Sequence, residues 1–94
     1  MITIQQIGKI VYDYFNIEVN KKTRKPEEVK CRQIICYFSR LYTKLSYSEI
    51  GEYIKRDYSS VIHSENKAKD FIKIYKDYAK EVEDIDKKIK DINQ

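Results

Sequence analysis

The sequence predicts an all-α fold, a small helical domain that contains a helix-turn-helix and ends in a long C-terminal helix. The 94 residues include only two Gly and one Pro, so few residues interrupt helices and a hairpin-rich β fold is disfavoured. Hydrophobic residues form 41% of the chain and recur at helical spacing, which suits a single core. A chain of this length makes one small domain at most.

The first expected helix covers residues 3–15, with Thr3 placed to cap its first turn. Its apolar positions recur every three or four residues: Ile4, Ile7, Ile10 or Val11, and Tyr14 or Phe15. The basic and polar residues 20–25 that follow predict a loop, which would hold Arg24 on an arm. Arginine arms often enter the minor groove of DNA, where the potential is most negative.

A second, longer helix is expected from Pro26 to about Thr43. Pro26 suits the first helical position, and Glu27 and Glu28 favour the positive end of the helix dipole. The expected apolar stripe comprises Val29, Ile34 or Ile35, Phe38, Leu41 and Tyr42. The other faces carry polar and basic side chains, namely Lys30, Arg32, Gln33, Arg40 and Lys44.

A short helix is predicted to begin after Ser46. Ser46 and Glu49 have the spacing of a capping box, in which each side chain accepts a hydrogen bond from the other residue's backbone. Ile50 and Ile54 lie one turn apart and can face a core. Gly51 costs about 1 kcal/mol relative to Ala inside a helix. We therefore expect the following helix to approach it closely.

The turn Lys55-Arg56-Asp57 leads into the next helix, which Asp57 can cap through its carboxylate. Val61 and Ile62 continue the apolar face. A polar strip points elsewhere and comprises Ser59, Ser60, His63, Asn66 and Lys67. Short hydrogen-bonding side chains near a helix N-terminus suit the reading of base edges in a major groove.

From Tyr58 to Asn93 no helix breaker occurs, which predicts one helix of roughly 30 residues. Its apolar residues step mostly by alternating four and three: Ala68, Ile72, Tyr75, Ala79, Val82, Ile89 and Ile92. This pattern is close to a coiled-coil seam and is consistent with a homodimer. It is also consistent with a break near residues 77–83, after which the chain folds back, and with packing on the first helix.

The formal net charge of +4 is unevenly distributed. Residues 20–44 carry eight basic and two acidic groups, whereas residues 65–94 carry eight of each. The basic block favours a polyanionic partner, although a solvated basic face would give the same pattern.

Cys31 and Cys36 lie about 140° apart on a helix, so they share neither a metal ion nor a disulfide easily. With His63 as the single histidine, no zinc-ligand spacing occurs. We expect two core thiols and no metal, cofactor or small-molecule ligand. No nucleophile–base pair can be assembled, so we do not expect an enzyme. No signal peptide or membrane span is recognisable, which predicts a cytoplasmic protein.

Three separated runs carry a resemblance to a known family. They are Lys30-Cys-Arg-Gln-Ile-Ile-Cys-Tyr-Phe-Ser-Arg40, Leu45-Ser-Tyr-Ser-Glu-Ile-Gly51 and Arg56-Asp-Tyr-Ser-Ser-Val-Ile-His63. Together they resemble the C-terminal DNA-binding domain of the bacterial replication initiator DnaA, a TrpR-like helix-turn-helix. The resemblance covers roughly residues 3–70, which we treat as the domain, with residues 71–94 as a helical extension. Tyr58 replaces the signature His of the family, and Ser59 and Ser60 replace two Thr.

The resemblance implies sequence-specific binding of double-stranded DNA, with the helix from Asp57 in the major groove and Arg24 in the minor groove. It also implies that the protein is nucleoid-associated. The residues it implies in base reading are Arg24, Asp57, Tyr58, Ser59, Ser60 and His63. The expected phosphate contacts are Arg32, Gln33, Arg40, Lys44, Tyr47, Arg56 and Lys67. The chain has no phosphate-cradling Gly-Lys-Ser/Thr loop, so we do not expect it to hydrolyse ATP.

Several of these roles have a second interpretation. Asp57 could be a helix cap alone, and Arg24 a charge in a solvated loop. The whole chain could also be a protein-interaction or dimerisation module that keeps the fold without reading bases. Under the DNA-binding hypothesis the chain could be a regulator, a competitor for initiator sites, or an accessory replication factor that binds an origin. Its source could be a bacterium or a mobile element.

Overall fold

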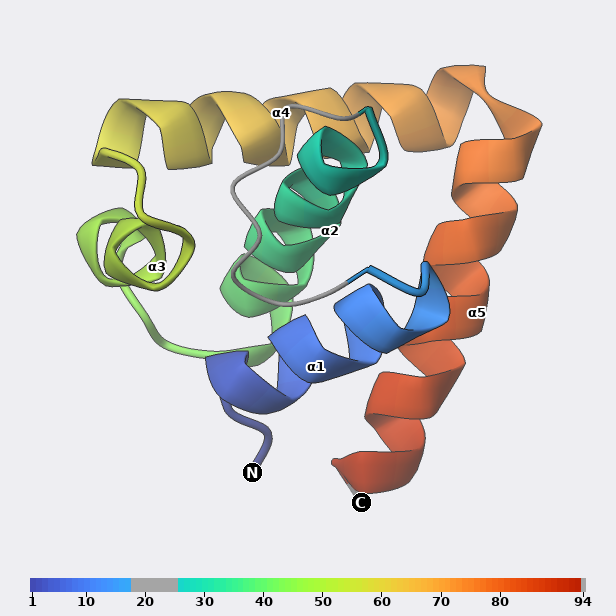
Figure 1. Cartoon of the computed structure of the whole chain (residues 1–94), viewed down its shortest axis with the longest axis horizontal. Helices are drawn as coiled ribbons and strands as arrows, with labels where there is room; N and C mark the ends of the chain where they lie inside the picture. Colours follow the sequence, from blue (N-terminus) through green and yellow to red (C-terminus); the bar gives the residue numbers. More distant parts are fainter. Residues whose placement is uncertain (18–25, 94) are drawn as a thin grey trace.

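The structure is a computed structural model that describes residues 1–17 and 26–93, and these residues form five helices and no strand. The helices are α1 (Ile4–Tyr14), α2 (Pro26–Tyr42), α3 (Tyr47–Ile54), α4 (Tyr58–Ile74) and α5 (Lys76–Ile92). In Figure 1, α2 lies in the middle, α4 crosses above it, and α5 turns down one side. The two chain ends lie at the same end of the molecule, where Ile2 N donates to Asn93 Oδ1 at 2.9 Å. The all-α prediction is confirmed.

Local capping explains where three of the helices begin. Thr3 and Gln6 form a capping box on α1, and Ser46 and Glu49 form another on α3. Asp57 caps α4 by accepting from Ser60 N at 2.8 Å. Each cap satisfies a backbone N–H that the helix itself leaves without a partner. The predicted caps at Thr3, Ser46 and Asp57 are therefore confirmed.

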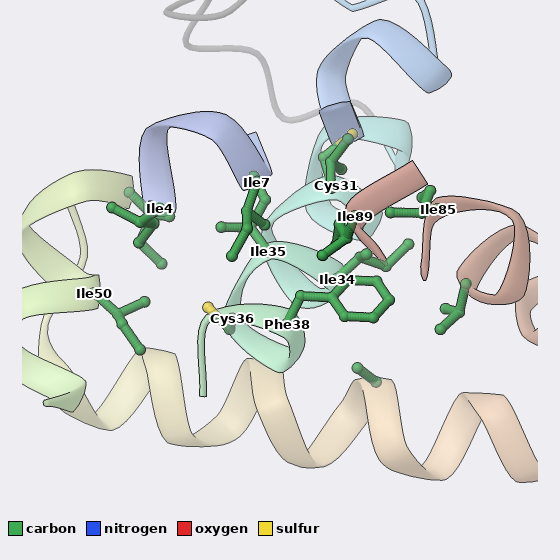
Figure 2. Packing of buried hydrophobic residues seen from close by; sticks show 14 of the residues in the cluster. Ile4, Ile7, Cys31, Ile34, Ile35, Cys36, Phe38, Ile50, Ile85 and Ile89 are labelled. Carbon is green, nitrogen blue, oxygen red and sulfur yellow. The ribbon is translucent and has the colours of Figure 1, made fainter. Parts of the chain in front are cut away.

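The core lies where α2 meets the other helices (Figure 2). Ile7, Ile34, Ile35, Phe38, Ile50, Ile85 and Ile89 are among its largest fully buried side chains. Cys31 and Cys36 are buried free thiols, as expected. None of the helices in the described ranges is long and apolar enough to cross a membrane.

The buried face of α2 differs from the predicted stripe, because it includes Cys31, Cys36 and Ser39 and leaves two of the predicted residues exposed. Val29 is 37% exposed and Leu41 is 57% exposed. Val29 lies in the first turn of α2, where it lines two open hollows beside α4. Leu41 lies in the last turn, at the edge of the buried face.

The prediction of one continuous helix from Tyr58 to Asn93 is wrong. α4 ends at Ile74, and Tyr75 has extended backbone (φ −111, ψ 116) before α5 begins. The break falls two residues before the range 77–83 in which a fold-back was considered. After it, α5 packs on α1, as the sequence also allowed. Turning the chain here buries Tyr78, Val82, Ile85 and Ile89 against the rest of the molecule.

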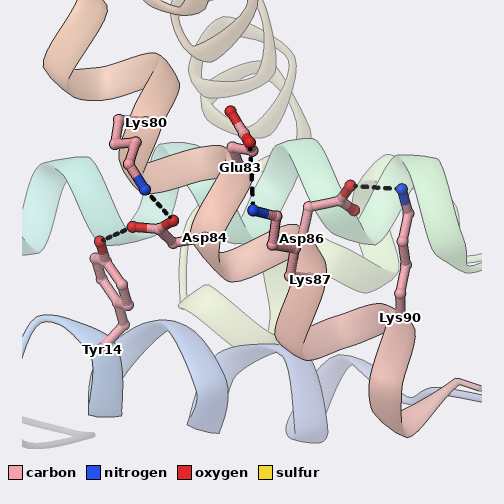
Figure 3. A network of polar contacts seen from close by, with 7 residues as sticks. All are labelled: Tyr14, Lys80, Glu83, Asp84, Asp86, Lys87 and Lys90. Atoms are coloured by element: carbon pink, nitrogen blue, oxygen red, sulfur yellow. Dashed lines mark hydrogen bonds and ion pairs between the residues drawn. The ribbon is translucent and has the colours of Figure 1, made fainter.

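The face of α5 that motivated the coiled-coil hypothesis therefore lies largely inside this chain. Val82 and Ile89 of that seam belong to the same core cluster as the apolar residues of α1 and α2. α5 also carries ion pairs one turn apart, including Lys80–Asp84 and Lys90–Asp86 (Figure 3). The division into a domain and an extension at residue 70 stays a prediction.

Candidate nucleic-acid interface

The turn between α3 and α4 is tight because of two backbone features. Lys55 adopts the left-handed conformation (φ 59, ψ 47), and Arg56 N donates to Gly51 O at 2.9 Å. A Cβ atom on Gly51 would lie 2.4 Å from the carbonyl oxygen of Arg56. Another part of the backbone does approach Gly51 closely, as predicted. That part is the turn at Arg56, not the following helix. Glycine here lets α3 and α4 sit at the short separation of a helix-turn-helix.

Asp57 stands exposed at the start of α4. One carboxylate oxygen, Oδ1, accepts from Ser60 N. Hydrogen bonds from Ser60, chiefly from its backbone N–H, lower the pKa of Asp57 below its ordinary value. The group is therefore a carboxylate at neutral pH, and its second oxygen is an additional hydrogen-bond acceptor.

An open hollow of ≈ 400 Å³ lies between the N-terminal part of α2 and the first turns of α4. Its lining residues are Val29, Arg32, Arg56, Asp57, Ser59, Ser60, His63 and Ser64. Four of the six predicted base-reading residues thus line one surface, beside two arginines. Such a surface combines hydrogen-bonding groups with positive charge, as nucleic-acid recognition requires.

The two arginines of the hollow differ in exposure and in their partners. The side chain of Arg32 is only 15% exposed, and its Nη1 lies 3.5 Å from Glu28 Oε1. Arg56 is exposed on the turn, where its Nη1 donates to Lys55 O at 2.9 Å. Arg32 is therefore an ion-paired and mostly buried charge on α2, whereas Arg56 is open to solvent.

Two further predicted residues lie on α4 outside the lining of the hollow. Tyr58 is 58% exposed in the first turn. Lys67 is exposed farther along the helix, with its ammonium 5.8 Å from the centre of the Phe71 ring. Lys67 extends the positive charge of the α4 strip toward its C-terminal half.

A second group of predicted residues gathers where α2 passes into α3. The guanidinium of Arg40 lies over the Tyr47 ring, with its carbon 4.2 Å from the ring centre, and its Nη1 donates to Leu45 O at 3.0 Å. The Tyr47 hydroxyl donates to Glu65 Oε1 at 2.8 Å. Lys44 is exposed in the connection. Tyr47 is thus engaged inside the protein.

Gln33 lies away from the base-reading residues. Its side-chain oxygen accepts from the Tyr78 hydroxyl at 3.1 Å, and it lines a different hollow with Phe71 and Tyr75. Adjacent helix residues point about 100° apart, so Arg32 and Gln33 face different surfaces. Arg24 lies outside the described residues.

Glu65 and Ser64 were not predicted from the sequence. Glu65 is 7% exposed and accepts from Tyr47, which lies 18 positions earlier in the chain. A contact at that separation leaves no periodic signal, although the spacing of Glu65 and Lys69 is typical of a helical ion pair. Among the described residues, no group of three or more His, Cys, Asp and Glu side chains could hold a metal ion.

A capped short helix, a tight turn and a second helix with an exposed polar strip define a helix-turn-helix protein. The sequence profile described as the bacterial dnaA protein helix-turn-helix matches residues 4–68, well over half of the chain. The chain therefore belongs to this family.

Curated relatives agree with this assignment. The chain is 35% identical to the chromosomal replication initiator protein DnaA of Bacteroides thetaiotaomicron over 79 residues, which is 80% of this chain and 17% of that protein. It is 39% identical to the DnaA of Flavobacterium psychrophilum over 67 residues (67% of this chain, 14% of the relative). It is 44% identical to the DnaA of Geotalea daltonii over 70 residues (70% and 16%). The chain spans less than a fifth of the length of these relatives.

Proposed function

We propose that this chain binds double-stranded DNA in a sequence-specific manner, with the start of α4 in the major groove. The single observation that supports this most is the hollow beside α4, which Asp57, Ser59, Ser60 and His63 line together with Arg32. A major groove of about 12 Å admits an α-helix, and side chains of these types can bond base edges. Membership of the DnaA helix-turn-helix family points the same way.

Four of the proposed base-reading residues, Asp57, Tyr58, Ser59 and His63, are exposed, and Ser60 is half-buried. Asp57 can cap α4 with one oxygen and accept from a cytosine amino group with the other. Ser59, Ser60 and His63 supply short donors and acceptors, and Tyr58 reaches past the first turn. Arg24 is proposed for the minor groove, on the basis of the family resemblance alone.

Positive charges around this face would fix the register of the protein on the duplex. The proposed phosphate contacts are Arg32, Arg40, Lys44, Arg56 and Lys67. Gln33 and Tyr47 also belonged to this predicted set, but they are uncharged and their side chains are hydrogen-bonded inside the protein. Arg32 and Arg40 also have internal contacts, but each brings a positive charge that attracts a phosphate. Phosphate contacts would supply most of the affinity and make it fall steeply with salt.

The relatives are named as chromosomal replication initiators. We infer a replication-initiator-like or regulatory role at an origin, carried out on the nucleoid. In this role the chain acts as a DNA-binding module and catalyses no reaction.

Binding to a randomised pool of duplexes, followed by sequencing, tests the proposal. An enriched sequence and its shuffled version are then compared by fluorescence anisotropy across a salt series. We expect tighter binding to the enriched duplex, and Lys67→Ala should reduce the slope of log K against log salt by about one unit. Absence of binding at low salt would contradict DNA binding and favour a protein-interaction module.

Two substitutions at Asp57 separate capping from base reading. Asn caps helices as well as Asp, but the second group of its side chain is a donor instead of an acceptor. Asp57→Asn should therefore keep the thermal stability and change the preferred base. Asp57→Ala should lose about 1 kcal/mol of stability as well, because the cap is gone. Unchanged base preference in Asp57→Asn would show that Asp57 is a cap alone.

A further inference from the structure

We propose that Tyr47 and Glu65 form a positioning pair, which fixes the rotation of α4 so that its polar strip meets the bases. This proposal rests on the proposed DNA-binding function. Tyr47 is the first residue of α3, and its hydroxyl donates to Glu65 Oε1 in the middle of α4 at 2.8 Å. The bond thus joins the two helices of the helix-turn-helix.

Glu65 lies on the side of α4 opposite Ser59, Ser60 and His63, three of the residues that would read bases. His63 and Glu65 are two positions apart, which is about 200° around the helix. Glu65 is 7% exposed and shares the buried side of α4 with Val61 and Ala68. A carboxylate held on the inner side therefore controls which way the outer side points.

The two fully buried apolar residues of that side, Val61 and Ala68, are small, and the larger Phe71 and Ile72 pack against the core only in the last turn of α4. Apolar contact has no preferred direction. A hydrogen bond is directional, so the Tyr47–Glu65 bond can define the rotation where Val61 and Ala68 cannot. On a helix about 10–12 Å across, a turn of about 10° moves a surface side chain by about 1 Å. Recognition sites must be held to about 0.5 Å, so this rotation matters for base reading.

The position of Tyr47 is itself fixed from α2. The Arg40 guanidinium stacks on the Tyr47 ring, and Arg40 also donates to Leu45 O in the connection between α2 and α3. On the other side, Lys69 Nζ lies 3.6 Å from Glu65 Oε2. Tyr47 has a single hydroxyl hydrogen, and it is used for Glu65. This is why we assign Tyr47 to positioning instead of phosphate binding.

The test compares Tyr47→Phe with Tyr14→Phe. Tyr14 makes a similar bond, with its hydroxyl 2.9 Å from Asp84 Oδ2, but between α1 and α5 (Figure 3). Both variants lose one tyrosine–carboxylate bond and should stay folded. The ratio of the dissociation constants for the shuffled and the enriched duplex should fall roughly tenfold in Tyr47→Phe, because a directional bond that aligns the reading face is lost. It should be unchanged in Tyr14→Phe.

Two substitutions of Glu65 separate positioning from stability. Glu65→Gln keeps an acceptor for the Tyr47 hydroxyl, so discrimination should stay near the wild-type value. The double variant Tyr47→Phe/Glu65→Leu removes both polar partners, so melting temperature should recover relative to Tyr47→Phe. Discrimination should not recover, because the directional bond is still absent. Recovery of both properties together would overturn the positioning role.

A measurement without DNA distinguishes failure of this proposal from failure of the proposed function. Amide NMR shifts of Ser59, Ser60 and His63 in the free protein should change in Tyr47→Phe and not in Tyr14→Phe. If the shifts change but wild-type protein does not discriminate between duplexes, base reading is refuted and the positioning of α4 stands. If they do not change, or if Tyr47→Phe discriminates as well as wild type, the positioning pair is refuted.

Discussion

Lys55 ends α3 in a backbone conformation that suits glycine better than lysine. Its φ of 59° and ψ of 47° lie in the left-handed region, which costs an L-residue about 1–2 kcal/mol. Helices commonly end with glycine in this conformation, because glycine has no Cβ to clash. The turn therefore stores strain that a single substitution can release.

We expect Lys55→Gly to raise the free energy of unfolding by about 0.5–1 kcal/mol, less than the full strain because glycine also loosens the unfolded chain. Lys55→Ala is the matched control, since it removes the same charge and keeps the strain. Urea denaturation of both variants measures the difference. Equal stability of the two variants would show that the conformation of residue 55 carries no cost.

Residue-level features were predicted well where they depend on close neighbours in the chain. The caps at Ser46 and Asp57 each join residues three apart, so spacing alone reveals them. The Tyr47–Glu65 bond depends on how α3 packs against α4, and no local pattern encodes it. No local pattern shows either that Arg32 and Gln33, which were predicted to share a role in phosphate binding, line different hollows.

At the scale of elements, four helix starts followed from sequence and the break at Tyr75 did not. No Gly or Pro marks that position. Local helix propensity does not predict the break, because tertiary packing can override it. The chain turns because α5 buries Val82, Ile85 and Ile89 on the core only in the new direction. Aromatic contacts of Phe71 with Tyr75 and Tyr78 hold the corner.

This role of α5 predicts a sharp contrast between two isoleucines one turn apart. Ile89 is fully buried, whereas Ile92 is 50% exposed. Ile89→Ala should lower the free energy of unfolding by about 2–5 kcal/mol, because it removes buried apolar area and leaves a cavity. Ile92→Ala should change it by no more than about 0.5 kcal/mol. Similar small losses for both variants in thermal and urea unfolding would mean that α5 does not belong to the core.

At the scale of the whole molecule, charge is arranged differently on the two sides. On α5, pairs such as Lys80–Asp84, Lys87–Glu83 and Lys90–Asp86 neutralise one another locally (Figure 3). On the α2–α4 side, Arg56 and Lys67 carry exposed positive charge, whereas Arg32 is paired with Glu28. An anionic duplex would therefore be attracted to the α2–α4 side, which agrees with the proposed orientation of the recognition helix.

The packed interior also predicts how stability depends on pH in alkaline solution. Burial raises the pKa of Cys31 and of Cys36 from 9.0 to about 12. Burial, together with a hydrogen bond to Asp86, raises the pKa of Tyr42 from 10.0 to about 12. In each case the unfolded chain loses its proton at lower pH than the folded protein does. Stability is therefore complete below about pH 9 and is lost as pH rises toward 12.

Urea denaturation from pH 7 to 11.5 should give a flat free energy of unfolding up to about pH 9 and a progressive fall above it. Each group with a raised pKa adds a slope of at most about 1.4 kcal/mol per pH unit. Tyr42→Phe removes one titrating group, so its curve should fall less steeply between pH 10 and 11.5 than that of the wild type. Parallel curves would mean that Tyr42 titrates alike in the folded and unfolded states, and its contact with Asp86 would then contribute nothing to the alkaline limit of the fold.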